Sequence, residues 1–383
     1  KANLEDLTET TASGNVTFSG AGAVFAGGVT SGVRIAGLTI PAGNWWAHSV
    51  VNEFETGSNK MRGRSVTYDP LDLRPRGFHQ VYQLPNLSSS SEIEYLASST
   101  FTSTLERVQL YDQTDALAAP WDIWIAAGQS NMACTNAGLP LDKVQDAWTD
   151  QRLMYFAGDT TSAFNTVKDS IDAARGPLVA AAISGGAFLD NPANNGVSPA
   201  LRFGQRIVQS TATSRSVVLI QTAVSGTSLE GADAAWNPAG NTGDGALAYD
   251  AMLARVAAAL AVAPAGSTIK GVLWAQGEGD TSSDMSSYPA SWATMRSAAE
   301  TAFGQGEIPW IILLGPADAT RSNQDEFRRV QAAMATNSGG PESQPQCYVV
   351  DRPTGYMEDS THVNAAGNRI AGERLASLAK SLL

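Results

Sequence analysis

From about residue 120 to the C-terminus, short apolar runs alternate with longer stretches whose apolar residues recur at helical spacing. The apolar runs cover residues 121–127, 216–224, 268–275, 308–314 and 346–350. Runs this short and this continuously apolar are typical of strands buried on both faces of a sheet. After the second run, Tyr249, Leu253, Val256 and Leu260 share one helical face. The alternation predicts a parallel sheet covered by helices on both faces.

A different texture covers residues 1–118, which are rich in glycine, serine, threonine and β-branched residues. Short runs of alternating apolar and polar residues, broken by glycine, predict antiparallel strands there. We predict an extended, strand-rich segment over 1–45, a smaller β-rich domain over 46–118 and an α/β domain over 119–383. Because a glycine- and threonine-rich start buries little apolar surface by itself, we also expect a homo-oligomer, such as a trimer, formed through it.

The charge and composition of the chain argue against several classes of binding partner. The net charge of −12 at pH 7 disfavours nucleic acid, whose partners usually present a basic face. The chain has three histidines and two cysteines, with neither H-x-x-x-H nor C-x-x-C spacing for a zinc site. No run approaches the roughly 18 apolar residues of a membrane helix. We therefore expect no metal, no other cofactor, no nucleic acid and no membrane insertion.

A serine lies three residues after the end of the first apolar run. Gly128, Gln129 and Ser130 come directly after residues 121–127, so Ser130 is expected at the carboxyl edge of the sheet, where α/β proteins place their sites. If a helix begins there, its free N–H groups would face the serine and could hold an oxyanion. The pattern fits a nucleophile and an ordinary helix N-cap about equally well.

Asp359 and His362 lie three residues apart, just before the last amphipathic stretch. A carboxylate at this spacing can orient an imidazole through its Nδ1–H. The same pattern also fits a surface loop with a solvated histidine. However, His362 is the only histidine after residue 118, so a nucleophilic Ser130 has no other base in the α/β part.

Two further loops follow predicted strands. In the segment Trp274 to Asp280, the side-chain amide of Gln276 could donate to a developing oxyanion. In the segment Val224 to Ser228, Gly226 could present its backbone N–H to the same oxygen. Either loop alone is a weak signal, because polar loops with a glycine turn are common.

Taken together, these segments resemble a known family. The motifs G-Q-S-N-M (128–132), S-G-T-S (225–228), W-x-Q-G-E-x-D (274–280) and D-x-x-H (359–362) are similar to the sequence blocks of SGNH (GDSL-type) hydrolases. They are closest to the sialate O-acetylesterase-like branch, which includes acetylxylan esterases. The resemblance covers roughly residues 119–383. It implies a flavodoxin-like three-layer αβα sandwich and deacetylation of sugars without a metal.

The resemblance also implies roles for single residues. Ser130 is then the nucleophile, His362 its base and Asp359 the acid that supports the base, with Glu278 as the alternative acid. The oxyanion hole is formed by the N–H groups of Ser130 and Gly226 and by the Gln276 amide. We further expect substrate contacts from the residues that flank the nucleophile, Gln129 and Asn131, and from Trp236, which could stack on a sugar ring but could equally belong to the core.

The expected function is that of a serine esterase that removes O-acetyl groups from a carbohydrate through an acetyl-serine intermediate. Sialic acid, a xylan-type polymer and a surface polysaccharide all remain open as substrates. The alternative is a catalytically weak glycan-binding module on the same scaffold, as part of a phage fibre or spike. A lipase or thioesterase is less favoured, because the loops are polar. We expect an extracellular location or one on a virion surface.

Overall fold

The computed structural model describes residues 118–133, 150, 152–156, 178–180, 198–230, 235–238, 247–281 and 284–383, together with eleven strands before residue 113. By contacts the chain divides into two compact units. One comprises Lys1–Ala118 and Leu141–Gln151, and the other comprises Ala119–Pro140 and Arg152–Leu383.

The second unit contains a sheet with the strand order β14-β13-β15-β12-β16-β17-β18. All its neighbouring strands pair in parallel except β13 and β14, which pair antiparallel. The strands are β12 (Trp121–Gly128), β13 (Leu153–Phe156), β14 (Leu178–Ala180), β15 (Ser216–Gln221), β16 (Thr268–Ala275), β17 (Trp310–Leu313) and β18 (Cys347–Val350). The predicted parallel sheet is thus confirmed, and each of the five apolar runs overlaps one of its strands.

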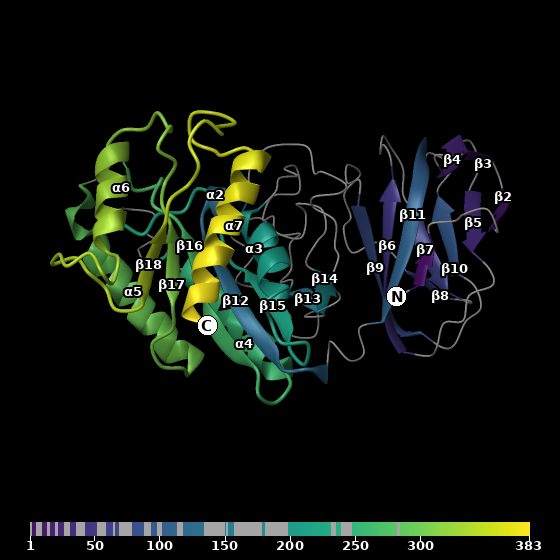
Figure 1. Cartoon of the computed structure of the whole chain (residues 1–383), viewed down its shortest axis with the longest axis horizontal. Coiled ribbons are helices and arrows are strands. Elements are labelled where there is room, and N and C mark those ends of the chain that lie inside the picture. The colour runs from purple at the N-terminus through teal and green to yellow at the C-terminus, as the bar shows by residue number, and fades with distance from the viewer. Residues whose placement is uncertain are drawn as a thin grey trace. The chain divides into compact units, whose positions relative to one another are not determined.

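Helices cover both faces of this sheet (Figure 1). On one face α3 and α7 pack against each other, and on the other α4 packs against α5, which also contacts α6. Their bounds are α2 (Ser130–Ala133), α3 (Pro199–Val208), α4 (Leu247–Val262), α5 (Tyr288–Phe303), α6 (Gln324–Ala333) and α7 (Ala365–Leu382), with a 3₁₀ turn, η5 (Met285–Ser287), before α5. The predicted αβα layering is confirmed.

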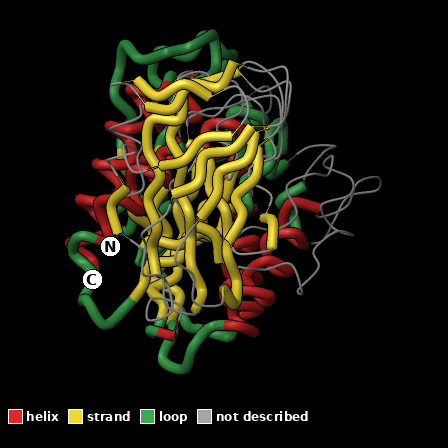
Figure 2. Tube along the Cα trace, turned by 90° about the vertical axis from the view of Figure 1, so that its right-hand side faces the viewer, coloured by secondary structure: helices red, strands yellow, loops and turns green. Residues whose placement is uncertain are grey.

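The described segments of the first unit are strands in two antiparallel sheets (Figures 1 and 2). One has the order β3-β4-β11-β6-β9, with β1 also paired to β11, and the other has the order β2-β5-β10-β7-β8. The strands are β1 (Ala2–Leu4), β2 (Thr10–Ser13), β3 (Val16–Ser19), β4 (Gly22–Ala26), β5 (Ser31–Ile35), β6 (Gly43–Val51), β7 (Asn59–Gly63), β8 (Val66–Tyr68), β9 (His79–Leu87), β10 (Ile93–Ala97) and β11 (Thr102–Asp112).

The predicted β-rich N-terminal domain is confirmed, but the boundary at residue 45 falls inside its sheets. Strand β4 pairs with β11, and β5 pairs with β10, so strands from 1–45 and 46–118 complete the same two ladders. Glycine-rich strands with few bulky residues can therefore pair with partners far along the chain, and the division at residue 45 stays a prediction. None of the helices in the described part of the chain is long and apolar enough to cross a membrane.

Candidate active site

The site lies where β12, β15 and β16 end. Strand β12 ends at Gly128, whose φ is +126°, a conformation that favours glycine. A Cβ at this position would lie 2.0 Å from the carbonyl oxygen of Ala275, the last residue of β16. The next residue, Gln129, donates its N–H to that oxygen at 2.8 Å. The tight turn therefore fixes the start of α2, and with it Ser130, beside the end of β16.

Ser130, His362 and Asp359 form a hydrogen-bonded chain. The Ser130 Oγ lies 3.0 Å from His362 Nε2, and His362 Nδ1 lies 2.7 Å from Asp359 Oδ2. Ser130 is 5% exposed, and the side chains of His362 and Asp359 are 16% and 43% exposed. The structure thus brings the three predicted residues together in the order of a nucleophile, a base and an orienting acid.

The surroundings of Asp359 favour its charged form. Burial raises the pKa of this carboxyl, but hydrogen bonds from the His362 side chain and from the N–H groups of His362 and Thr361 outweigh it, so the pKa lies below its ordinary value. Both N–H groups donate to Oδ1 at 2.7 Å. An ionised Asp359 accepts the Nδ1–H of His362, which leaves Nε2 facing Ser130 with its lone pair, as a general base requires.

Glu278 is placed elsewhere. Its Oε1 accepts a hydrogen bond from Asn131 Nδ2 at 2.7 Å. Of the two carboxylates that the sequence offers as the supporting acid, the structure therefore brings Asp359 to the histidine and Glu278 to the asparagine that follows the nucleophile.

The three residues expected to contact substrate are buried, which corrects that prediction. Asn131 is fully buried, and its side chain makes hydrogen bonds with Glu278, Thr361 and Val363. Gln129 is 3% exposed, and its Oε1 accepts from Gly279 N at 3.1 Å. These short polar side chains brace loops against one another.

Trp236 is also a core residue and not a sugar platform. Its ring is fully buried and stands edge-on to Trp274, with 5.0 Å between ring centroids. Its Nε1 donates to Thr227 Oγ1 at 2.9 Å. The indole thus packs beneath the loop that carries Gly226, with no face open to a ligand.

The turn at Gly226 lies beside the nucleophile. Val224 donates its N–H to Gly128 O at 2.9 Å, which joins the loop after β15 to the turn before Ser130. Gly226 has a φ of +74°, and no atom lies within 4 Å of where its Cβ would be. This geometry is compatible with an oxyanion donor at Gly226, which remains a prediction together with the Ser130 N–H.

Gln276 is more constrained than the prediction assumed. Its Nε2 donates to Asp280 Oδ2 at 2.6 Å and lies 3.3 Å from Thr227 O, while its Oε1 accepts from Tyr288 at 2.9 Å. Both amide hydrogens thus point at acceptors within the chain. The geometry favours a bracing role for Gln276 over that of a third oxyanion donor.

Asp280 is the last residue of the motif W-x-Q-G-E-x-D, and no role was predicted for it. Its carboxylate accepts from the N–H groups of Leu229 and Glu230, at 3.1 and 2.9 Å, as well as from Gln276. It is 1% exposed, and this burial raises its pKa despite these hydrogen bonds. Asp280 therefore ties the loop that carries Gly226 to the end of β16. Its position in the motif was the available signal.

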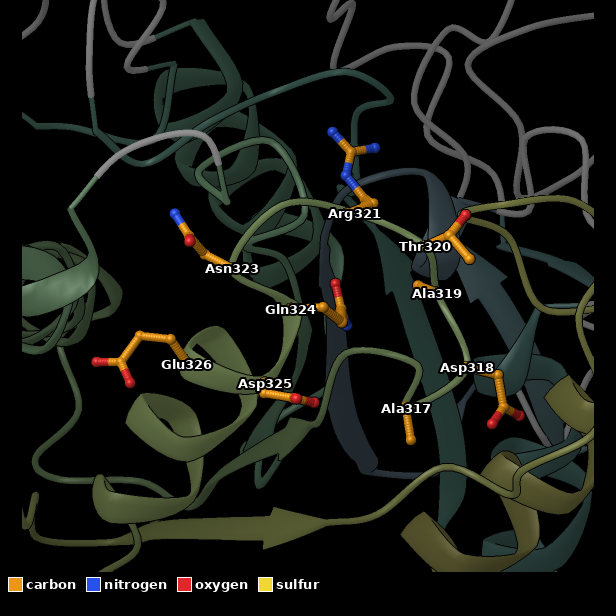
Figure 3. A pocket seen from close by; sticks show the side chains of 9 residues that line it. All are labelled: Ala317, Asp318, Ala319, Thr320, Arg321, Asn323, Gln324, Asp325 and Glu326. Carbon is orange, nitrogen blue, oxygen red and sulfur yellow. The ribbon is translucent and has the colours of Figure 1, made fainter.

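Figure 3 shows a pocket of about 740 Å³ near the loop that carries Asp359 and His362. Its lining residues come from the loop after β17 and from the first turn of α6, within residues 317–326. Thr320 donates its N–H to Ser360 O at 3.0 Å, and Arg321 Nη1 lies 3.3 Å from Thr361 Oγ1. No motif marks this segment, so it was not predicted from the sequence. Among the described residues no three His, Cys, Asp or Glu side chains are grouped to hold a metal ion.

Comparisons with known proteins bear on the family and the fold. Residues 120–381 match the model of a family described as "carbohydrate esterase, sialic acid-specific acetylesterase". A solved protein of Arabidopsis thaliana is 19% identical, with 69% of this chain and 98% of that chain covered and a TM-score of 0.51, which supports the fold. Similar structures also include NanS (16% identity, 69% and 98% covered, TM-score 0.49) and a carbohydrate acetylesterase from Xanthomonas citri (17%, 91% and 70%, 0.45). No curated protein matches the sequence.

Proposed function

The chain belongs to the carbohydrate esterase family described as sialic acid-specific acetylesterase, and we propose that it removes O-acetyl groups from a carbohydrate through an acetyl-Ser130 intermediate. One observation carries the proposal: Ser130 Oγ, His362 and Asp359 are linked by contacts of 3.0 and 2.7 Å at the carboxyl edge of the sheet. A surface histidine or an N-cap serine would not require this arrangement.

The proposed reaction has two similar halves. His362 Nε2 takes the proton of Ser130 as the serine oxygen attacks the acetyl carbonyl carbon. The imidazolium is stabilised by ionised Asp359, and the oxyanion faces the N–H groups of Ser130 and Gly226. The C–O bond to the sugar then breaks, and His362 returns the proton to the departing sugar oxygen. Water, deprotonated by His362, hydrolyses the acetyl ester, which releases acetate and restores the serine.

O-acetylated sialic acid is the first substrate that we propose, because the description of the family names it. Acetylated xylan and acetylated surface polysaccharides are the comparison substrates. The alternative of a binding module without turnover is disfavoured, because a module that only binds a glycan has no use for a serine in contact with an aspartate-supported histidine.

The test compares the wild type with Ser130→Ala on p-nitrophenyl acetate, butyrate and octanoate, and then on the three classes of glycan. We expect acetate release that falls with acyl chain length and drops by on the order of 10⁴-fold or more in the variant. Ser381→Ala is the matched control, because Ser381 is an exposed serine near the end of α7 that bonds only locally. Equal slow rates in the wild type and Ser130→Ala would reject the esterase.

A further inference from the structure

The buried carboxyl group of Glu278 takes no part in the proton transfers described above. Glu278 is 1% exposed, and it follows β16 by three residues. One of its oxygens accepts from Asn131 Nδ2 at 2.7 Å, and the other is buried without a hydrogen-bond partner among the described residues. An unpaired oxygen on a buried carboxylate is costly to the fold, and costs of this kind are often borne at functional sites.

Asn131 connects this carboxylate to the catalytic loop, by which we mean the segment from Asp359 to His362. Its Nδ2 donates a second hydrogen bond to Thr361 O at 3.1 Å, and its Oδ1 accepts from Val363 N at 3.1 Å. Thr361 and Val363 are the two chain neighbours of His362. The residue after the nucleophile therefore holds the backbone on both sides of the base, and the separation of Ser130 Oγ and His362 Nε2 depends on this clamp.

The clamp works in only one orientation of the Asn131 amide. If the amide were flipped, its NH₂ would face the Val363 N–H, and its oxygen would face both Thr361 O and Glu278. A carboxylate at position 278 offers only acceptors, so it accepts the NH₂ group and disfavours the flipped form. Its hydrogen bond is also charge-assisted and short. A glutamine at 278 would have nearly the same shape but would lose the charge assistance and could also donate, so it would hold the Asn131 amide less firmly, although Thr361 O and the Val363 N–H still favour the same orientation.

We propose that Glu278 is a positioning residue: through Asn131 it fixes the backbone around His362, and it is not the acid that supports the base. This inference rests on the proposed function, because it assumes that His362 serves Ser130. Glu278 then acts on His362 without touching it. A chain of hydrogen bonds runs from Glu278 to Asn131 and from there to Thr361 and Val363.

The experiment measures kcat and KM for p-nitrophenyl acetate in Glu278→Gln, Asn131→Ala, the double variant and Asp359→Asn. Because Glu278→Gln should displace His362, we expect kcat to fall on the order of 10- to 100-fold in this variant while KM stays nearly unchanged. If Glu278 acts through Asn131, the double variant should be no slower than Asn131→Ala alone. Losses that multiply in the double variant would overturn the proposal, as would a wild-type kcat in Glu278→Gln.

Asp359→Asn distinguishes positioning from direct support of the base. If Glu278 were the supporting acid, Asp359→Asn would keep most of its activity and Glu278→Gln would lose on the order of 10⁴-fold; that result would overturn the proposal. The control for losing a buried carboxylate is Glu300→Gln. Glu300 accepts from Arg296 and Trp310 at the opposite end of the sheet and should affect stability without affecting kcat.

A second measurement covers variants that fold poorly. The rate at which a fluorophosphonate labels Ser130 at low temperature reports the activation of the serine without a sugar substrate. We expect slower labelling in Glu278→Gln and wild-type labelling in Glu300→Gln; equal rates in these two variants would overturn the inference. Failure of the proposed function is distinguishable, since it would appear as wild-type hydrolysis that survives Ser130→Ala.

Discussion

Three hydrogen bonds, which exist only when the loop is folded, stabilise the negative charge of Asp359. Its pKa is lower in the folded chain than the ordinary value of about 3.9 in an unfolded chain. A group with a depressed folded pKa stabilises the fold above its unfolded pKa, and this stabilisation disappears as the pH falls through the folded pKa. We therefore expect urea unfolding to show the wild type more stable than Asp359→Asn at pH 7, with the difference narrowing from pH 5 downward.

The control for this prediction is Asp325→Asn, which removes the same charge from an exposed carboxylate in the first turn of α6. In parallel, Asp359→Asn should lower kcat on the order of 10⁴-fold at pH 7, because the imidazole loses the partner that selects its tautomer. A stability difference that widened toward acid pH would contradict the assignment of Asp359 as the depressed carboxyl.

The sequence could predict which residues meet at the site but not which way each side chain turns. Ser130, Asp359 and His362 were assigned through the resemblance of their motifs to SGNH hydrolases, since the local pattern alone fitted a helix N-cap and a surface loop as well. Asn131 was expected to contact substrate because it follows the nucleophile, and Trp236 because it could stack on a sugar ring, yet both are fully buried. Burial depends on loops that close over a residue from distant parts of the chain, such as Thr361 and Val363 over Asn131.

Helices α3 and α7 approach each other closely at Gly372. A Cβ at this position would lie 2.3 Å from Pro199 O and 2.7 Å from Arg202 Cβ, both in α3. Alanine is a better helix former than glycine by about 1 kcal/mol, so Gly372→Ala in an exposed helix would stabilise. Here we expect the opposite, a loss of about 1–3 kcal/mol in the free energy of unfolding, because the helices must separate.

Chemical denaturation of Gly372→Ala measures this loss. Ser377→Ala is the control on the same helix, where an exposed position should change stability by no more than about 0.5 kcal/mol. Since α7 follows the catalytic loop directly, a shifted α7 should also lower kcat. A stabilised Gly372→Ala would show that the two helices are not held as closely as described.

Elements were predictable where local pattern and tertiary environment agree. The run 268–275 became β16 with the same bounds, because continuous apolar character suits a central strand. Strands β13 and β14 were missed, since three or four residues are too few for a pattern. Helix α5 was not predicted, although Trp292, Met295, Ala299 and Phe303 form its buried stripe.

On the scale of the whole molecule, the net charge of −12 should be felt by a charged substrate. Sialic acid carries a carboxylate, so long-range repulsion should slow its encounter with this chain. The Debye length falls from about 30 Å at 0.01 M salt to about 8 Å at 0.15 M. We therefore expect kcat/KM for O-acetylated sialic acid to rise severalfold over this range.

Neutral acetylated xylo-oligosaccharides provide the control, because their kcat/KM should stay flat over the same salt range. A fall in kcat/KM with salt for the anionic sugar alone would instead indicate a locally basic approach to the site. Both series can be measured by acetate release at a fixed pH.

The strands at the two ends of the first unit meet, because β1 (Ala2–Leu4) pairs with β11 (Thr102–Asp112). A module whose chain ends lie close together can be inserted into another protein without pulling those ends apart. Strands β1 to β11 could therefore be moved between proteins as one cassette, by natural recombination or by protein engineering. The same closeness of the ends would suit a circular permutation that joins them.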